Sequence, residues 1–248
     1  MKFGKGRSAV TVNVPTREAL FRTIRARFAD GTGFALATLN LDHLTKLPVD
    51  DAFASAYRAQ DLVVADGRPI IWLSRLARQP VALMPGSDLV LPLSAEAARA
   101  GVPIALMGSS DSALAGAKAA LERDVPGLNV AYTHAPPYGF DPTGADAVQI
   151  CEELNKSGAR LCFIALGAPK QEIFAAFARG RCPAVGFASI GAGLDFLSGH
   201  QVRAPRIMRA LALEWLWRAG QSPRRMVPRY AKCFAILPGL AVQAWRQR

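Results

Sequence analysis

Residues able to handle hydroxyl groups follow two apolar segments of the chain. Asp66 comes directly after the run DLVVA, within the motif ADG, and a carboxylate at a strand end is well placed to act as a general base on a hydroxyl. An Asp before Gly is also a common turn residue. Thr38 and Asn40, in the motif TLN, end a second apolar run and suit the binding of sugar hydroxyls, although helix capping explains Asn40 equally well.

A glycine turn at 107–111, MGSSD, follows a third apolar run. Gly108 would form the turn, and the exposed backbone N–H groups at the start of the following helix can hold a phosphate. The motif lacks the full GxGxxG fingerprint, so it is poor support for a dinucleotide site, and Asp111 is also explained as a helix N-cap.

The motif GAPKQE at 167–172 is more specific. Gly167 forms the turn, and Pro169 suits the first position of a helix. The side-chain amide of Gln171 can bind an amide or uracil edge. Glu172 has a simpler explanation, because a carboxylate in the first turn interacts favourably with the helix dipole.

The segment 191–230 combines a lone carboxylate with a basic helical pattern. Asp195 follows the apolar run AVGFASI and a cluster of small residues. A site at a strand end, followed by an arginine-rich helix, suits an anionic substrate held close to a negatively charged surface. The arginines of this segment are Arg203, Arg206, Arg209, Arg218, Arg224, Arg225 and Arg229.

Net charge is concentrated at the two ends of the chain. The 248 residues carry a formal charge of +11. Residues 196–248 contain ten Lys and Arg against one acidic residue, and residues 1–29 contain seven against one, so the segment between them has a charge of −4. Composition is that of a globular protein, with 51% hydrophobic and 20% charged residues, which excludes a disordered or fibrous chain.

Four scattered cysteines form no CxxC pair, which argues against a zinc site or a disulfide framework and fits a reducing cytosol. No apolar run reaches the roughly 18 residues of a membrane span, and the N-terminus has no apolar signal-peptide region. We therefore expect a soluble or peripheral protein.

Apolar strand-like runs alternate with helical patterns through most of the chain, which predicts an α/β fold with a mostly parallel sheet covered by helices on both faces. Ligands of such folds bind at the carboxyl ends of the strands. The predicted strands are 33–39, 61–65, 102–107, 128–133, 160–166 and 184–190. The predicted helices between them are 16–29, with Thr16 as N-cap, 50–59, 68–77, 87–99, 111–123, 143–157 and 169–179.

The alternation stops near Gly199, so we divide the chain into an α/β core, 1–199, and a basic helical C-terminal appendage, 200–248. The appendage pattern predicts two helices, 204–218 and 223–246, the second interrupted near Pro238. Its apolar residues are flanked by Arg, Lys and Trp, as in a helix that lies in a membrane interface. An ordinary docked helix with a solvated basic face is an equal alternative.

Two other functional classes fit parts of the pattern. The basic composition is compatible with a non-enzymatic nucleic-acid-binding protein, although no RRM, KH, zinc-finger or helix-turn-helix pattern is present and the central segment is slightly acidic. The alternating architecture alone is compatible with a nicotinamide-dependent oxidoreductase, but a convincing GxGxxG is missing.

Seven motifs in one order resemble the bacterial WecG/TagA/CpsF glycosyltransferase family over roughly residues 34–232. These are TLNLDHL, VVADGRPIIWLSRL, GSDL, ALMGSS, FIALGAPKQEIF, GAGLDFLSG and EWLWRAGQSPRRMVPRY. The resemblance implies a Rossmann-like domain with a C-terminal appendage. It also implies an inverting, metal-independent enzyme without a cofactor, which transfers a sugar from a UDP donor to a polyprenyl-diphosphate-linked saccharide.

The resemblance also implies roles for individual residues. Asp66 would be the catalytic base, with Thr38 in contact with substrate. Three residues, Tyr138, Gln171 and Asp195, would surround the uracil. Arg218, Arg225 and Arg229 would reach the diphosphate, and Pro228 stands where many relatives carry a further arginine. In this chain PYGF at 137–140 replaces the commoner GYF order, so the position of Tyr138 departs from the family pattern.

The implied location is the inner face of the cytoplasmic membrane, with the enzyme peripheral on anionic lipid and no nucleic acid bound. Products in the family feed enterobacterial common antigen, wall teichoic acid, capsule or exopolysaccharide. N-acetylmannosamine, its uronic acid and glucose all occur as donor sugars, and the segments LNLDHL and RPIIWLSRL favour glucose slightly. Subunit association is implied as well, so a homo-oligomer is plausible.

Overall fold

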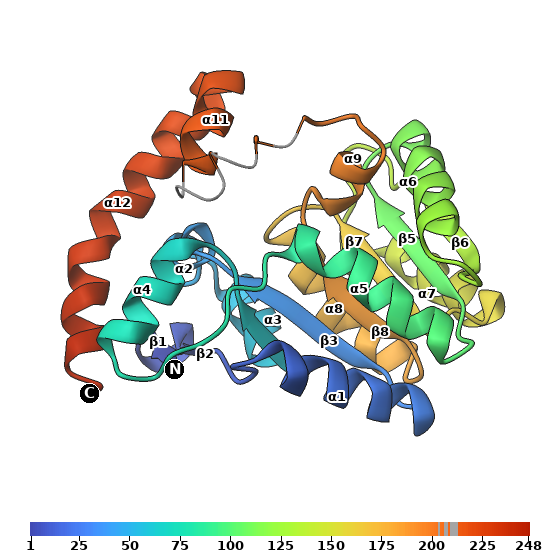
Figure 1. The fold of residues 1–248 in the computed structure, drawn as a ribbon, viewed down its shortest axis with the longest axis horizontal. Coiled ribbons are helices and arrows are strands. Elements are labelled where there is room, and N and C mark those ends of the chain that lie inside the picture. Colours follow the sequence, from blue (N-terminus) through green and yellow to red (C-terminus); the bar gives the residue numbers. More distant parts are fainter. Residues whose placement is uncertain (203, 206–207, 209–212) are drawn as a thin grey trace.

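The computed structural model describes residues 1–202, 204–205, 208 and 213–248, without the side chain of Arg218. The arginines at 203, 206 and 209 lie outside the described residues, as do residues 206–207 and 209–212 of the helix predicted over 204–218. The C-terminal helices extend along one side of an α/β body (Figure 1).

The body is built on a six-stranded sheet in which every neighbouring pair is parallel, as the continuous apolar runs predicted. The strand order is β4-β3-β8-β7-β5-β6. Each strand begins and ends within two residues of its predicted bounds. The strands are β3 (Phe34–Leu39), β4 (Leu62–Ala65), β5 (Ile104–Gly108), β6 (Val130–His134), β7 (Leu161–Ala165) and β8 (Gly186–Ser189).

Helices cover both faces of this sheet (Figure 1). One face packs against α1 (Arg17–Ala29), α5 (Gly86–Arg99) and α6 (Asp111–Asp124), and the other packs against α3 (Asp51–Arg58), α7 (Ala145–Ser157) and α8 (Lys170–Arg181). The remaining helices are α2 (Leu41–Lys46), α4 (Arg68–Leu76), α9 (Gly193–Leu197), α11 (Glu214–Gln221) and α12 (Pro223–Trp245).

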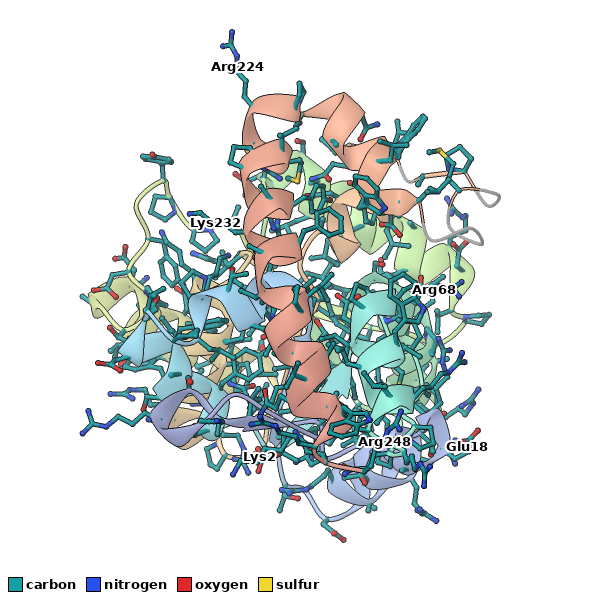
Figure 2. All side chains as sticks on the ribbon, turned by 90° about the vertical axis from the view of Figure 1, so that its left-hand side faces the viewer. Lys2, Glu18, Arg68, Arg224, Lys232 and Arg248 are labelled. Atoms are coloured by element: carbon teal, nitrogen blue, oxygen red, sulfur yellow. The ribbon has the colours of Figure 1, made fainter. Side chains whose placement is uncertain are left out.

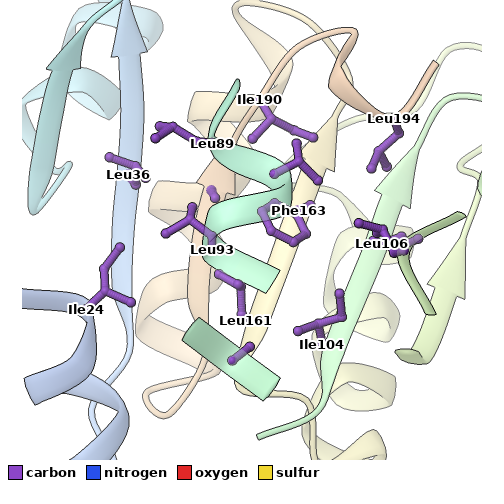
Figure 3. Close-up of a cluster of buried hydrophobic side chains, with 14 of the residues drawn as sticks. Ile24, Leu36, Leu89, Leu93, Ile104, Leu106, Leu161, Phe163, Ile190 and Leu194 are labelled. Atoms are coloured by element: carbon purple, nitrogen blue, oxygen red, sulfur yellow. The ribbon is translucent and has the colours of Figure 1, made fainter. Parts of the chain in front are cut away.

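The largest hydrophobic cluster joins α5 to the centre of the sheet (Figure 3). Leu89 and Leu93 of α5 are fully buried, as are Leu36 of β3, Leu161 of β7 and Phe163 of β7. Burying a side chain of this size contributes roughly 1.5–3 kcal/mol, so the central strands are held rigidly and their carboxyl ends form a fixed platform.

A short N-terminal hairpin, which the sequence did not predict, joins the two ends of the chain. It consists of β1 (Lys2–Phe3) and β2 (Val10–Thr11), linked through a 3-10 turn, η1 (Gly6–Ser8). The side-chain amide of Gln243 in α12 donates to the Gly4 carbonyl at 3.0 Å, and that of Gln247 donates to the Lys2 carbonyl at 2.8 Å. Figure 2 shows Lys2 and Arg248 at the same end of the molecule.

The C-terminal helix α12 packs against α2 and α4, and its Cys233 and Ala244 are buried in a cluster shared with the hairpin. The predicted interruption near Pro238 is wrong, since α12 continues through both Pro228 and Pro238. A proline removes one backbone hydrogen bond from a helix interior. Buried residues on both sides of Pro238 hold the two halves against the body, so the helix does not end there.

Smaller differences concern helix starts. The sequence analysis did not predict α2, a helix of only six residues that Asn40 caps, nor α9. Pro169 is the N-cap of α8 and not its first residue, and Ser110, not Asp111, caps α6 through a hydrogen bond from the Ala113 N–H. Helix boundaries depend on cap geometry, which hydrophobic periodicity does not specify.

Candidate functional site

Three predicted site residues meet at the carboxyl ends of β3 and β4. The Asp66 N–H donates to the Leu39 carbonyl at 2.7 Å, so the turn that carries Asp66 lies against the end of β3. Thr38 is buried, and its hydroxyl donates to the Ser189 carbonyl of β8 at 3.3 Å. Asn40 follows β3 directly and caps α2. Asp66, Thr38 and Asn40 therefore lie at the same edge of the sheet, as predicted.

The chain leaves β3 and β8, which are neighbours, in opposite directions. From β3 it runs through α2 and α3 to β4, whereas from β8 it runs to α9, which packs against α5 and α6 (Figure 1). Ligands of open α/β sheets bind in the crevice that such a reversal creates. The reversal places Asp66, Thr38 and Asn40 on one side of the crevice and the segment that follows β8 on the other.

The start of α5 packs closely against the end of β8. A Cβ atom on Gly86 would lie 2.9 Å from the Ile190 Cα, which is closer than real Cβ contacts. Only glycine allows this approach, so the GSDL motif at 86–89 has a backbone role: it brings the N-terminus of α5 against the end of β8.

Asp195 connects α9 to the end of β5. One of its carboxylate oxygens accepts a hydrogen bond from the Ser109 hydroxyl, and the other accepts one from the Gln201 side chain at 2.6 Å. Gln201 also lines a small pocket of about 50 Å³ together with Arg225 of α12. The structure therefore brings two predicted residues, Asp195 and Arg225, close to Gln201.

A second charged cluster fastens α12 to the body. The Arg229 Nε lies 2.9 Å from one carboxylate oxygen of Asp42, and the Lys46 Nζ lies 2.8 Å from the other. Burial raises the pKa of Asp42, but Lys46 and Arg229 together hold it below the ordinary value. Lys46 also donates to the Ala168 carbonyl at 3.1 Å, next to Gly167 at the end of β7. Arg229 therefore lies near the strand ends, with two charged neighbours that the sequence analysis missed.

Gln171 and Glu172 belong to a buried polar network behind the strand ends. Gln171 is 3% exposed and Glu172 is fully buried, so Glu172 is not a solvated residue that merely favours the helix dipole. The Gln171 amide donates to a Glu172 carboxyl oxygen at 2.8 Å. His43 of α2 lies 4.0 Å from the same oxygen and 2.6 Å from the Tyr57 hydroxyl. Burial lowers the pKa of His43 to about 3, so this imidazole is neutral.

Burial raises the pKa of Glu172 from its ordinary 4.5 to about 7. Between these two values the folded protein keeps a proton that the unfolded chain releases, so stability falls as pH rises. At 1.36 kcal/mol for each pH unit, the full penalty above pH 7 is about 3 kcal/mol. We expect Glu172→Gln to gain stability relative to wild type as pH rises from 4.5 to 7, with a plateau above. Urea unfolding of both proteins at pH 5 and pH 8 measures this. The expectation is contradicted if the variant and wild type differ in free energy of unfolding by the same amount at both pH values.

Tyr138 is fully exposed in the loop after β6. The Phe140 carbonyl of this loop accepts a hydrogen bond at 2.8 Å from Lys170, the neighbour of Gln171, so the loop reaches the start of α8. The Arg218 side chain lies outside the described structure. The residues that sequence reasoning missed had weak local signals: Asp42 and Lys46 are spaced as an i,i+4 pair in LDHLTK, and Ser109 follows Gly108.

Over the described ranges, each helix is too short or too polar to cross a bilayer. In the same ranges, no three His, Cys, Asp or Glu side chains cluster closely enough to hold a metal ion. The four cysteines are buried and unpaired. Metal independence and the lack of a cofactor remain predictions.

Comparison with known protein families matches nearly the whole chain. Residues 8–248 match the model described as "Glycosyl transferase WecG/TagA/CpsF family". The match identifies the chain as an enzyme, which removes the non-enzymatic nucleic-acid-binding alternative, and as a transferase, which removes the oxidoreductase. With the resemblance in seven motifs and the observed parallel α/β fold, it shows that this protein is a glycosyltransferase of cell-surface polysaccharide synthesis and belongs to the WecG/TagA/CpsF family.

Proposed function

We propose that the protein is an inverting, metal-independent glycosyltransferase that moves a sugar from a UDP donor to a polyprenyl-diphosphate-linked saccharide, with Asp66 as the general base. Family membership implies a nucleotide-sugar donor and a lipid-linked acceptor in general. The observation that carries the finer proposal is the position of Asp66 at the end of β4, beside Thr38 of β3 and Asn40, which follows β3, where the chain leaves β3 and β8 in opposite directions.

In this reaction the Asp66 carboxylate takes the proton of the acceptor hydroxyl while that oxygen attacks the anomeric carbon. The bond from the anomeric carbon to UDP breaks on the opposite face, as in inverting hydrolysis with a sugar in place of water. Thr38 and Asn40 supply a hydroxyl and an amide beside the reacting groups. Negative charge develops on the departing UDP, and arginines are suited to neutralise it.

Arg225 is a candidate for that task, since it lines a pocket together with Gln201, the partner of Asp195. We expect Arg225→Gln to lower kcat/KM for sugar transfer by about 10- to 100-fold, because a hydrogen bond to a charged group contributes about 1.5–3 kcal/mol. Initial rates at several donor concentrations measure this.

Arg224 offers the matched control. It is the preceding residue of α12, and its side chain projects away from the body at the end of the helix (Figure 2). Arg224→Gln removes the same charge and should change kcat/KM less than about twofold, as expected for exposed surface charges. Equal losses in the two variants would contradict a specific role of Arg225.

We further propose that the enzyme works as a peripheral protein on the anionic inner face of the cytoplasmic membrane. Support comes from α11 and α12, which expose large apolar side chains beside basic residues. Each basic residue near an anionic leaflet adds about 1 kcal/mol of attraction. Flotation with anionic and neutral vesicles tests this. The exposed apolar residues are Trp215, Leu216, Val227, Phe234, Val242 and Trp245, and Arg224 and Lys232 are exposed with them.

Titration calorimetry with UDP in the presence of EDTA, at two salt concentrations, tests the donor part of the proposal. Micromolar binding without metal is the expected result, and glucose, N-acetylmannosamine and its uronic acid are then compared as UDP-linked donors, glucose first. Absence of binding both in solution and with anionic vesicles would overturn the UDP assignment. Sedimentation of the same samples determines whether the enzyme forms the homo-oligomer that the family resemblance implies.

A further inference from the structure

The buried carboxyl group of Glu172 has no part in the mechanism above, yet it touches a predicted donor-binding residue. Its Oε1 accepts the hydrogen bond from the Gln171 side-chain amide at 2.8 Å, while its Oε2 has no hydrogen-bond partner. Both residues stand in the first turn of α8, directly behind the strand ends. Burying an ionisable group costs stability, so its place beside the site calls for a functional explanation.

The Gln171 amide is held at both ends. Its nitrogen donates to Glu172, and its oxygen accepts the backbone N–H of Gly191 at 3.1 Å. Gly191 is the first residue after Ile190 at the end of β8 and has a φ of +59°. An ionised carboxylate can only accept hydrogen bonds, so Glu172 compels the amide nitrogen to face it and the amide oxygen to face Gly191. The Gly191 N–H can only donate, so the two partners together fix which way round the amide lies.

The same carboxyl group faces a second set of fixed polar groups. Asn40 uses its side-chain oxygen to accept the His43 backbone N–H at 3.1 Å, which leaves its amide nitrogen 3.4 Å from the His43 Nε2. The Nε2 therefore acts as an acceptor, and the ring proton lies on Nδ1, which donates to the Tyr57 hydroxyl at 2.6 Å. With its proton directed to Tyr57, His43 gives none to Glu172, and the donors to that carboxyl group are the Gln171 amide and the Glu172 backbone N–H.

We infer that Glu172 is a positioning residue, which fixes the Gln171 amide so that its oxygen holds the Gly191 turn in the form that receives the donor nucleotide. The last clause rests on the proposed function, whereas the link from Glu172 to the Gly191 N–H rests on hydrogen-bond geometry alone. Loss of the negative charge weakens the constraint, because a neutral carboxyl or amide can both donate and accept. The Gly191 N–H then favours this orientation alone, so the Gln171 amide is held less firmly.

The charge of Glu172 is itself sensitive to pH near neutrality, since burial raises its pKa to about 7. Lys46 of α2 opposes this rise and Asp42 of α2 supports it. His43 of α2 and Tyr57 of α3 face the same carboxyl group and stay neutral, and Arg229 of α12 acts on this set through Asp42. The Gly191 turn should therefore be held firmly at pH 8 and less firmly at pH 6.

Glu172→Gln in the full chain tests the inference, with amide hydrogen exchange of Gly191 followed by NMR at pH 6 and pH 8. After correction for intrinsic exchange, we expect Gly191 in the variant to exchange about fivefold faster than wild type at pH 8, the effect of one hydrogen bond of about 1 kcal/mol. Wild type should lose protection between pH 8 and pH 6, and the variant should not change. Glu152→Gln, an exposed residue of α7, is the control for charge removal and should match wild type.

Unchanged Gly191 protection in Glu172→Gln, together with wild-type protection that is equal at both pH values, would overturn the inference. Nucleotide binding is the second readout, with UDP-glucose as probe because its diphosphate has no group that titrates near pH 7. We expect about threefold weaker binding in Glu172→Gln at pH 8. A wild-type protein that binds no UDP-glucose or UDP would refute the proposed function, whereas the exchange data would still decide the role of Glu172 in the turn.

Discussion

Replacement of Asp66 by asparagine should abolish sugar transfer while UDP binding is retained. Asparagine keeps the shape of the side chain but cannot take a proton from the acceptor hydroxyl. General-base catalysis contributes about 10²- to 10⁴-fold, so we expect a fall in kcat of about 10³-fold. Transfer to a lipid-diphosphate acceptor measures the rate, and titration calorimetry with UDP shows whether the site is intact.

Asp111→Asn is the matched control for this experiment. Asp111, like Asp66, is an aspartate between a strand and a helix, but it is exposed and belongs to the first turn of α6, far along the sheet from β4. Its replacement should leave kcat within about twofold, as is usual for surface changes. Near-normal turnover in Asp66→Asn would remove Asp66 from the role of base, and equal losses in both variants would point to a general loss of charge.

Replacement of Gly108 by alanine should strongly lower the free energy of unfolding. Gly108 has a φ of +103°, which side-chain-bearing residues rarely adopt, and an added Cβ would lie 2.5 Å from the Ala165 carbonyl oxygen. The atom in conflict belongs to the backbone of β7, which cannot move without breaking its pairing with β5. Backbone strain and overpacking each cost about 1–3 kcal/mol, so we expect a loss of about 3 kcal/mol or more in urea unfolding.

Gly101→Ala distinguishes backbone strain from overpacking. Gly101 has a φ of +64°, and a Cβ added there would meet no atom within 4 Å. This variant carries the backbone cost alone, about 1 kcal/mol. A Gly108→Ala variant no less stable than Gly101→Ala would mean that the strand end adapts easily. The expected larger loss would show that glycine is needed at 108 for the strand pairing, independently of any phosphate that the turn binds.

The strands of the sheet and its main helices could be predicted, because each has a pattern within its own segment of the sequence. Continuous apolar runs such as 34–39 and helical periodicity such as 17–29 predicted all six strands of the sheet and its main helices, because these patterns record burial of a strand on two faces and of a helix on one. The same reasoning predicted that Asp66, Thr38 and Asn40 lie at one edge, since all parallel strands end on the same side.

The sequence did not predict elements that are very short or that depend on contacts with distant parts of the chain. The hairpin formed by residues 2–3 and 10–11 has too few residues for a periodic signal, and α2 contains fewer than two turns. The continuity of α12 through Pro238 was mispredicted, because the packing of Cys233 and Ala244 against the body outweighs the lost backbone hydrogen bond. In each case contacts distant in sequence decide the local structure, and a window of neighbouring residues does not contain them.

The sequence by itself determined the fold class, the family and the identity of the chemical groups at the strand ends, because these follow from patterns within short segments. Only the tertiary structure decided which groups meet and which are buried: that Arg229 pairs with Asp42, that Tyr138 is fully exposed, and that Glu172 is buried against Gln171. The strand order, the packing of α3 against α8 and the packing of α12 against α2 set these contacts. A carboxylate in a first helical turn looks solvated in the sequence, and its burial depends on helices more than a hundred residues earlier in the chain.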